Sequence, residues 1–560
     1  MKVLFANNLV KIQASGLDYL RIKTEVAKYV GAAVKTSRGE ICFPLSCLDV
    51  VKQNIPRIAA ELPNECKNDP YEIHAKARLI ALDGMHNCAT NLLPDYWCDI
   101  LDIHQQYAVN AMVVPGLLGL CLFDEQGSGK TVMTIAALDI LKVSGAIDAA
   151  IIVSPKNMLS GWGNDINKFA PNKYQCQILS GDSAKKHKLA LSDWNILISN
   201  YEGIEAALVT LTALAQNRRF LLIADESYYA KNPDAERSLI LSELRKVCAK
   251  AYVLCGTPAP NSPYDLINQF NLADMGYSFS IFHKTGNLDN DREAIEHLIN
   301  SRGAYIRRLK KDIYPNLPEK HFNIIRVSLQ GRQRMLYDQA KSDLVMELRS
   351  YDNRTFKKHL TSYFQKREAL LKICALPTLI EPTFPGTPAK YAVLDDLLQR
   401  LFNEKRKVII WTAYTASIDE LVNRYAFFEP LVVDGRVSGN DRGKAVQEFQ
   451  NNSKRLLFIA NPEAGGPGIT LHASHDAIYL SYTNKAASHL QSIDRIHRRG
   501  QTAHEVNYYY LICENTIEET EISRLRAREL QQHDLLGDTY TWPASLDEAI
   551  GELTNELPHV

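Results

Sequence analysis

Short runs of β-branched and other apolar residues recur along the chain, and stretches with helical periodicity separate them. Near-continuous apolar strands that alternate with amphipathic helices are typical of parallel sheets covered by helices. One set of strands is predicted at 121–123, 149–154, 195–200, 220–226 and 251–257. A second set is predicted at 407–414, 430–435, 455–461, 477–482 and 506–513. The pattern therefore predicts an α/β protein with two parallel-sheet lobes.

Between these sets the chain is charged and helical in pattern, and a proline-rich stretch at 381–390 marks a boundary. The first 90 or so residues read as a separate small α+β module. The predicted domains are an N-terminal module (1–90), a first lobe (91–300), a helical insertion and linker (301–389), a second lobe (390–530) and a C-terminal tail (531–560).

Composition narrows the classes of protein that fit this pattern. Lys and Arg (64) balance Asp and Glu (64), so any binding to nucleic acid has to come from local patches. The eleven cysteines include no Cys-x-x-Cys pair, which favours reduced thiols in a cytosolic protein over a zinc site. No apolar run approaches the roughly 18 residues that a membrane span needs, and the N-terminal apolar stretch is too short for a signal peptide.

The stretch LFDEQGSGKT at 122–131 follows a predicted strand and precedes a helical pattern. Its glycines let backbone N–H groups face phosphates, and the helix N-terminus adds a positive dipole. Lys130 can reach the β- and γ-phosphates of a nucleotide, and the Thr131 hydroxyl can bind Mg²⁺. A strict phosphate-loop motif has glycine where this chain has Asp124, so a plain helix-starting loop is the alternative. The predicted loop residues are Gly127, Ser128, Gly129, Lys130 and Thr131.

An acidic pair follows the apolar strand at 220–224. Ligands bind at the carboxyl ends of strands in open α/β sheets, which is where Asp225 and Glu226 are expected. Asp225 would hold Mg²⁺, and Glu226 would orient or deprotonate the attacking water. The alternative is a common surface Asp-Glu pair, but the upstream phosphate loop favours a site for ATP hydrolysis.

The phosphate loop resembles the Asp-Glu-Met-Gly-Leu-Gly-Lys-Thr motif of the Swi/Snf (sucrose-non-fermenting) family of ATP-driven DNA translocases, in helicase superfamily two. Further stretches resemble the family's motifs in chain order, at 101–112, 151–169, 196–204, 254–270, 305–320, 370–380, 461–481 and 491–501. The resemblance implies two RecA-like lobes, ATP and Mg²⁺ as cofactors, and double-stranded or forked DNA as partner of a monomeric enzyme.

The resemblance also implies roles for further residues. Gln105 would read adenine, and Arg495 and Arg498 would act as arginine fingers on the γ-phosphate. The implied nucleic-acid contacts are Asn200, Thr257, Gly465 and Gly466, and Gly468 would contact the nucleotide. The implied coupling residues are Tyr228, Gly256 and Gln491. The segment RRLKK at 307–311 has two interpretations, a cationic patch for DNA or a brace packed on the first lobe.

Three departures from the family pattern matter. Tyr228 stands where the family has the histidine of Asp-Glu-Ala-His, and Asn200 stands where it usually has threonine. The family's Trp-Asn-Pro is replaced within 481–491, which puts its aromatic DNA contact in doubt. Tyrosine keeps a hydrogen-bonding hydroxyl but does not titrate near neutral pH. The hypothesis is that hydrolysis survives and that its coupling to DNA is altered.

The expected function is ATP-dependent translocation on duplex DNA, to remodel or reanneal it in repair, replication or recombination. The N-terminal stretch 18–55 resembles the small module that precedes the motor in annealing helicases, where it helps recognise forks. The alternatives are the motor of a restriction or phage-defence system, an RNA helicase, and an inactive DNA-binding scaffold. The expected location is the cytoplasm of a bacterium or of a virus-infected cell, or the nucleus of a eukaryote.

Overall fold

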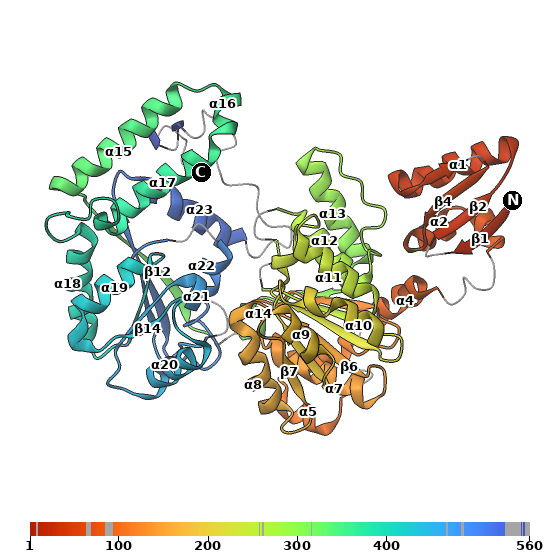
Figure 1. The fold of residues 1–560 in the computed structure, drawn as a ribbon, viewed down its shortest axis with the longest axis horizontal. Coiled ribbons are helices and arrows are strands. Elements are labelled where there is room, and N and C mark those ends of the chain that lie inside the picture. Colours follow the sequence, from red (N-terminus) through yellow and green to blue (C-terminus); the bar gives the residue numbers. More distant parts are fainter. Residues whose placement is uncertain are drawn as a thin grey trace. The chain divides into compact units, whose positions relative to one another are not determined.

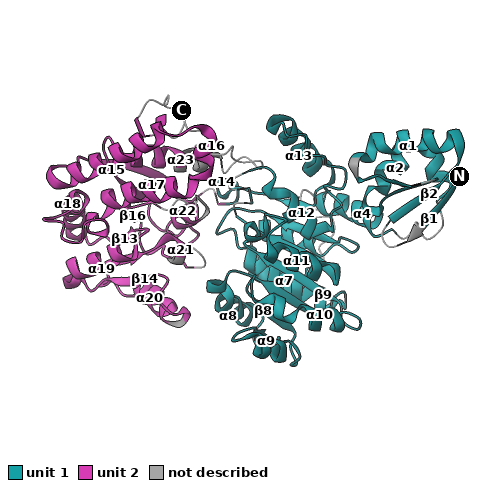
Figure 2. Ribbon diagram, turned by 45° about the horizontal axis from the view of Figure 1, so that its top comes forward, with its two compact units in different colours: residues 1–313, 534–537 teal, residues 314–533, 538–560 magenta. Residues whose placement is uncertain are grey.

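The computed structural model of the chain divides into two compact units, the first spanning Met1–Ile313 and the second beginning at Tyr314 (Figure 2). Each unit contains its own parallel sheet. The structure describes residues 1–6, 9–37, 39–62, 69–83, 93–256, 258–259, 262–314, 316–465, 469–482, 486–531, 550–551 and 553–554.

The central sheet of unit 1 has the strand order β11-β5-β10-β9-β6-β8-β7, and every neighbouring pair is parallel. Every residue of β5, β6, β8 and β9 is buried, because helices cover both faces of the sheet. The strands are β5 (Gly119–Leu122), β6 (Ala149–Val153), β7 (Cys176–Ile178), β8 (Ile196–Ser199), β9 (Phe220–Asp225), β10 (Cys248–Leu254) and β11 (Tyr305–Ile306).

Helices surround this sheet (Figure 1), and two hydrophobic clusters fill the space between the sheet and its helices. On one face lie α6 (Ile103–Met112), α7 (Lys130–Val143) and α8 (Leu159–Phe169). On the other face lie α10 (Leu208–Leu214), α11 (Glu236–Lys246), α12 (Asp265–Asp274) and α13 (Leu288–Arg302). The remaining helices of this part are α5 (Asp95–Ile100), α9 (Ser183–Ala190) and α14 (Lys310–Ile313).

The first residues of unit 1 form a separate antiparallel sheet of order β1-β2-β4-β3. Alternating buried and half-buried residues in β2 and β4 give the sheet one apolar face, on which α1 and α2 pack. The elements are β1 (Lys2–Ala6), β2 (Leu9–Gln13), α1 (Gly16–Val30), β3 (Lys35–Ser37), β4 (Glu40–Pro44), α2 (Leu48–Asn54), α3 (Pro56–Ala60) and α4 (Pro70–Asp83).

A buried charge network attaches this small sheet to the rest of unit 1. Arg302, the last residue of α13, donates from Nη1 to Asp49 Oδ2 in α2 at 2.8 Å. The Tyr277 hydroxyl donates to the same oxygen at 2.8 Å, and the Arg302 guanidinium lies 4.0 Å from the centre of the Tyr277 ring. The N-terminal module is therefore packed on the rest of unit 1 through paired charges and an aromatic ring.

The sheet of unit 2 has the order β12-β17-β16-β13-β15-β14, again with parallel pairs only. The long edge strand β12 follows β17 over its whole length, from Glu319 beside Glu505 to Val327 beside Cys513. The strands are β12 (Glu319–Val327), β13 (Val408–Trp411), β14 (Leu431–Val433), β15 (Leu457–Ala460), β16 (Asp476–Tyr479) and β17 (Glu505–Cys513).

Helices cover the unit 2 sheet on both faces, with α18 and α19 on one and α20 and α22 on the other. The pair α15 and α17 adds an apolar cluster of its own around Tyr337 and Leu370. The helices are α15 (Gly331–Arg349), α16 (Asn353–Lys358), α17 (Leu360–Ala375), α18 (Ala389–Asn403), α19 (Thr415–Arg424), α20 (Gly439–Asn451), α21 (Pro462–Gly465), α22 (Ala486–Ile493) and α23 (Ile517–Gln531).

The two parallel-sheet lobes predicted from the sequence are confirmed, and each predicted strand has its counterpart. The apolar pattern did not predict β7, β11 or β12. Strand β12 alternates between exposed and half-buried residues and shows no apolar run, and β11 has two residues. The predicted insertion at 301–389 therefore contributes a strand to each lobe. Among the described residues, no helix combines the length and the apolar character needed to cross a membrane.

A buried ion pair joins the start of α18 to the start of α23 in unit 2. Lys390 Nζ donates to Glu518 Oε1 at 2.6 Å, and both side chains are at most 1% exposed. Lys390 also donates to the Leu480 carbonyl at 2.7 Å, and Glu518 Oε2 accepts from the Cys513 N–H at 2.8 Å. Burial is the largest effect on the pKa of Lys390 and acts to lower it, but the Glu518 carboxylate, together with Cys513 and Cys374, raises that pKa above its usual value.

We expect Lys390→Met to destabilise unit 2 by about 3–5 kcal/mol, because it leaves the Glu518 carboxylate buried without its cation. Denaturant unfolding of the full chain, followed by a probe in unit 2, measures the change. The matched control is Lys444→Met, since Lys444 pairs with Asp441 on the surface and such pairs contribute about 0–1 kcal/mol. If the two variants are equally stable, the buried ion pair of Lys390 does not stabilise unit 2 as expected.

Candidate active site

The phosphate loop lies between β5 and α7, as predicted, and its backbone requires glycine. Gly127 and Gly129 have φ of 86° and 90°, in the left-handed region that glycine adopts without strain. A Cβ on Gly129 would also lie 2.2 Å from Gln105 Nε2. The Ser128 hydroxyl is buried and has no hydrogen-bond partner among the described residues. The loop thus combines close backbone approach with a donor that an anion would satisfy.

Lys130 is the first residue of α7 and its side chain turns back over the loop. Its ammonium donates to the backbone carbonyls of Asp124 at 2.7 Å and of Glu125 at 3.1 Å. Burial lowers the pKa of Lys130, and the carboxylates of Glu226 and Asp124 oppose that shift. Thr131 follows Lys130 and is half-buried. The cation therefore lies inside the loop, where it would face a bound phosphate.

The acidic pair lies at the carboxyl end of β9. Asp225 Oδ2 accepts from Trp162 Nε1 at 2.8 Å and from Ser154 Oγ at 3.0 Å. Its Oδ1 accepts from the Glu226 N–H at 2.9 Å. Burial raises the pKa of Asp225, while these donors and the Lys130 ammonium act to lower it. Asp225 is thus fixed by the strand-following loop of β6 and by the first turns of α8.

Glu226 follows directly and has unusual geometry. Its φ of 49° and ψ of 53° are in the left-handed region, which costs a residue with a side chain roughly 1–2 kcal/mol. Its side chain is buried, and Oε1 accepts from Gln126 Nε2 at 2.9 Å. The strain and the hydrogen bond together direct the carboxylate toward the phosphate loop.

The donor set fits a Mg²⁺ ion bound partly through water. A carboxylate offers about four lone-pair positions, and protein donors use three of those on Asp225. One position on Oδ1 is left and would accept from a metal-bound water, and the Thr131 hydroxyl at the start of α7 would supply an oxygen ligand. Mg²⁺ prefers oxygen ligands and keeps several of its waters, so a site with few protein ligands suits it.

Gln105 lies against the phosphate loop rather than away from it. Its Oε1 accepts from the Asp102 N–H at 3.0 Å, and its Nε2 donates to the Ser128 carbonyl at 3.0 Å. The side chain is buried and belongs to a capping box at the start of α6. In the structure this amide holds the loop against α6, and adenine reading by Gln105 stays a prediction.

The segment 307–311 forms a brace on the phosphate loop. Arg308 donates to both carboxylate oxygens of Asp124, which is fully buried, and the Lys310 N–H donates to Glu125. Arg307 Nη1 donates to the Gly256 carbonyl at 2.9 Å. Of the two interpretations from the sequence, these contacts favour the brace. They also explain Asp124, which the brace holds by its carboxylate.

Asn200, a predicted nucleic-acid contact, and Gly256, a predicted coupling residue, follow parallel strands at the same edge of the unit 1 sheet. Asn200 follows β8, and its Nδ2 donates to Glu202 Oε2 at 2.7 Å. Gly256 follows β10, and a Cβ on it would lie 2.7 Å from the Gln126 side chain. Thr257 lies outside the described residues. The DNA contacts of Asn200 and Thr257 and the coupling role of Gly256 stay predictions.

Tyr228 lies in the short 3-10 helix at Ser227–Ala230, directly after the acidic pair. Its ring centre is 4.6 Å from that of Tyr229, which stacks at 5.6 Å on Tyr201. Burial and the Glu226 carboxylate raise the pKa of Tyr228 well above its usual value. The hydroxyl therefore stays protonated at neutral pH.

The two predicted arginine fingers of unit 2 are in different environments. Arg495 is buried and donates to the carbonyls of Gln491 at 2.7 Å and of Ile469 at 2.9 Å. It therefore links helix α22 to the segment at Ile469 within its own unit. Arg498 is half-buried. Gln491 in α22 is buried, and its amide has no hydrogen-bond partner among the described residues.

Two further predicted residues of this unit, Gly466 and Gly468, lie outside the described residues, and Gly465 ends α21. Sequence reasoning missed the contacts of Ser154, Trp162 and Gln126 with the acidic pair. Ser154 and Trp162 lie in the stretch 151–169 that resembles a family motif. The family's phosphate loop has methionine where this chain has Gln126. This difference was the one signal in the sequence that could have pointed to the contact of Gln126.

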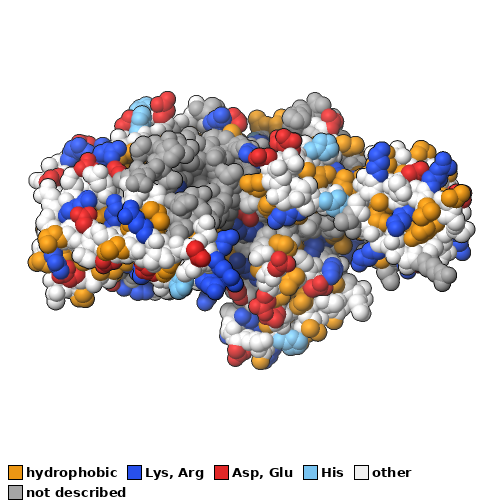
Figure 3. Space-filling model, turned by 90° about the horizontal axis from the view of Figure 1, so that it is seen from above, with side chains coloured by type: hydrophobic (Ala, Val, Ile, Leu, Met, Phe, Trp, Pro, Cys, Tyr) orange, Lys and Arg blue, Asp and Glu red, His pale blue; other side chains and the backbone are white. Residues whose placement is uncertain are grey.

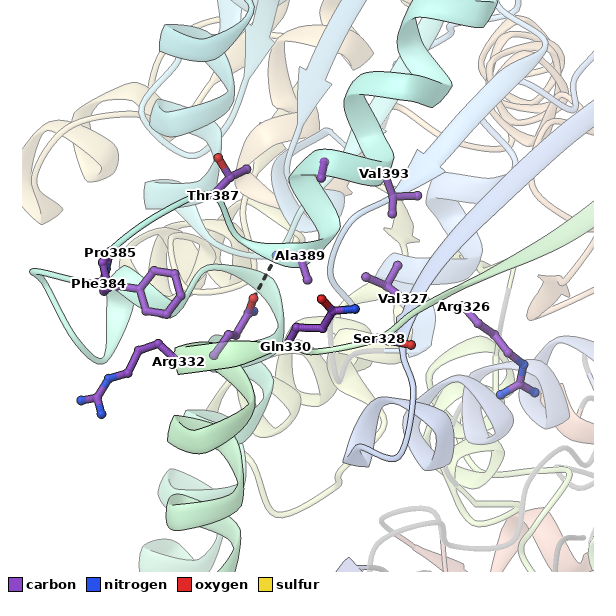
Figure 4. Close-up of a pocket in the computed structure, with 12 residues that line it drawn as sticks. Arg326, Val327, Ser328, Gln330, Arg332, Phe384, Pro385, Thr387, Ala389 and Val393 are labelled. Carbon is purple, nitrogen blue, oxygen red and sulfur yellow. Dashed lines mark hydrogen bonds between the residues drawn. The ribbon is translucent and has the colours of Figure 1, made fainter.

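Unit 2 also contains an open cavity of about 420 Å³ (Figure 4). It lies between the end of β12, the start of α15 and the proline-rich stretch before α18. Its lining includes Phe384, Val393 and Gln330, and the Ala389 N–H donates to Gln333 Oε1 beside it. None of the predicted site residues lines this cavity.

Positive and negative side chains are interspersed on the face of each unit shown in Figure 3. This agrees with the equal numbers of acidic and basic residues in the chain. Affinity for a polyanion would therefore depend on particular donors on the motif loops.

Family models match most of the chain after the N-terminal module. The model of the SNF2-related domain matches residues 86–379, which is more than half of the chain, and that of the helicase conserved C-terminal domain matches residues 389–500. A solved structure, the Sulfolobus solfataricus SWI2/SNF2 ATPase core in complex with dsDNA, covers 81% of this chain and 96% of its own, with 23% identity and a TM-score of 0.37.

Curated relatives match over the same region. The ISWI chromatin-remodeling complex ATPase ISW1 of Saccharomyces cerevisiae is 27% identical over 433 residues, 72% of this chain and 37% of that protein. The uncharacterized ATP-dependent helicase MG018 of Mycoplasma genitalium is 27% identical over 419 residues, 72% and 38% of the two chains. The chain thus spans about two fifths of the length of the curated relatives it matches. With an SNF2-related domain followed by a helicase C-terminal domain, the chain belongs to the Swi/Snf family that its motifs resemble.

Proposed function

We propose that the chain is an ATP-hydrolysing motor that moves along double-stranded DNA. The observation that carries the proposal is the meeting of the phosphate loop after β5 with the acidic pair after β9, at one edge of the unit 1 sheet. Membership of the Swi/Snf family supports it, and relatives are named as ATPases and as an ATP-dependent helicase.

The residues divide the chemistry among them. The loop N–H groups and Lys130 bind the phosphates of ATP, and Thr131 and Asp225 hold Mg²⁺, which neutralises charge on the phosphate oxygens. Glu226 orients the attacking water and takes its proton. The Gln126 hydrogen bond keeps that carboxylate in place.

Unit 2 supplies the arginine finger in this proposal. Arg498 is the better candidate for direct contact with the γ-phosphate, because the Arg495 guanidinium donates to carbonyls within the unit. Arg495 then acts by holding α22 against the segment at Ile469. Because the finger is on a different lobe from the bound ATP, hydrolysis occurs only when the two lobes approach each other. In this proposal, the coupling of hydrolysis to lobe movement drives the steps along DNA.

DNA is gripped by its backbone, since a chain without excess positive charge gains affinity from a few phosphate contacts. The proposed contacts are Asn200, Thr257, Gly465 and Gly466. A finer proposal is reannealing or remodelling of forked DNA. The packing of the N-terminal module on the first lobe through Arg302 supports it. Through such packing, binding of a DNA junction by the module can influence the lobe that hydrolyses ATP.

We expect Lys130→Ala to reduce the ATPase rate at least 100-fold, because the phosphates lose their buried cation. The steady-state rate with saturating duplex DNA measures it. Lys188→Ala is the matched control, since Lys188 is an exposed residue of α9 outside the site. An unchanged rate in Lys130→Ala would overturn the assignment of the site.

The choice of nucleic acid separates the proposal from its alternatives. We expect duplex or forked DNA to stimulate the ATPase at least 10-fold more than RNA, since binding is to the duplex DNA backbone. The test compares rates without nucleic acid and with single-stranded, duplex and forked DNA or RNA. Stimulation by RNA alone would indicate an RNA helicase. A complete lack of ATPase activity would indicate a DNA-binding scaffold.

We expect Tyr228→His to keep ATP hydrolysis without DNA within about threefold and to change the DNA-stimulated rate by a larger factor. Histidine titrates at about pH 6.5, whereas the Tyr228 hydroxyl stays protonated. The stimulation by DNA should therefore become dependent on pH between about 6 and 7.5 in the variant. Stimulation equal to that of the unaltered protein at each pH would refute a coupling role for Tyr228.

A further inference from the structure

Gln126 belongs to one motif loop and contacts two others. It belongs to the phosphate loop, its Nε2 donates to Glu226 Oε1 after β9, and its side chain lies over Gly256 after β10. No motif of the resemblance assigns it a role. We propose that Gln126 is a positioning residue that holds the Glu226 carboxylate for attack on ATP and makes its position depend on the backbone at Gly256.

The contact with Gly256 leaves no room for a side chain there. A Cβ on Gly256 would lie 2.7 Å from Gln126 Cγ and Nε2 and 2.8 Å from its Cδ. Because Gly256 has no side chain, the Gln126 amide fits between the loop after β9 and the loop after β10. The Gly256 carbonyl is itself held by Arg307 Nη1 at 2.9 Å, so the backbone on which Gln126 rests is fixed by the brace.

The hydrogen bond to Glu226 acts on a carboxylate that needs support. Glu226 is buried and its backbone is in the left-handed region, so its side chain leaves β9 in a direction that ordinary strand geometry would not give. An amide that donates to a carboxylate forms a charge-assisted bond, stronger than a neutral one. Since a carboxylate only accepts, the NH2 group of Gln126 must face it.

Two departures from the family pattern are next to this one carboxylate. Gln126 replaces the methionine of the family's phosphate loop, and Tyr228 replaces the histidine after its acidic pair. The Glu226 charge acts on the Tyr228 hydroxyl, so both side chains are close to it. Methionine cannot donate a hydrogen bond, whereas Gln126 can. In this chain the amide donates a hydrogen bond to the acidic pair, and its side chain packs against the loop after β10.

The test rests on the proposed function and uses the full chain with Gln126→Met, which keeps the side chain's length and removes the donor. We expect kcat with saturating duplex DNA to fall about 10-fold, the loss expected when a positioning hydrogen bond to a reacting group is removed. KM for ATP and the affinity for a fluorescent ATP analogue should stay within about twofold, because the loop backbone and Lys130 are unaltered. Gln126→Glu, which places a second carboxylate against Glu226, should reduce kcat further.

The control is Gln216→Met, the same substitution at an exposed position of unit 1. A kcat for Gln126→Met equal to that of this control would overturn the positioning role. A matching loss of kcat and of ATP affinity would also overturn it, since Gln126 would then only shape the phosphate loop. These outcomes differ from failure of the proposed function, in which the unaltered protein itself shows no DNA-stimulated ATPase.

Discussion

Parallel pairing of β5, β10 and β9 is the constraint on which the candidate site depends. Leu254 of β10 pairs with Leu122 of β5 on one side and with Asp225 of β9 on the other. The three strands therefore end in one row, and the loops that follow them meet there. Antiparallel pairing of any one of these strands would send its loop to the opposite edge. The phosphate loop, the acidic pair and Gly256 are neighbours for this reason.

Ion pairs join residues of the chain that lie outside the strands of the sheets. Arg308 with Asp124, Arg302 with Asp49 and Lys390 with Glu518 each join segments that are far apart in the sequence. Burial makes each charge costly when it is alone, so the energetic penalty for a wrong pairing is larger than the gain from the right one. Such pairs define which segments belong together. At Asp124 the pair also fixes the loop that receives the nucleotide.

The strands and the motif loops could be predicted from the sequence because buried parallel strands have continuous apolar runs, as in 220–226. Strand β12 could not, because an edge strand with half-exposed residues has no such run. The residue types of the site were also predictable, but the directions of their side chains were not. Gln105 and Arg495 illustrate this limit, since both donate to carbonyls of their own unit. Which partner a long polar side chain takes depends on contacts distant in sequence.

The backbone at Glu226 has a consequence for the engineering of this protein. A side chain in the left-handed region makes the folded state less stable than glycine at the same position would. Substitution of glycine at position 226 would therefore relieve the backbone but remove the carboxylate that the proposed mechanism uses. A stabilised version of this chain that keeps Glu226 has to gain its stability elsewhere in the fold.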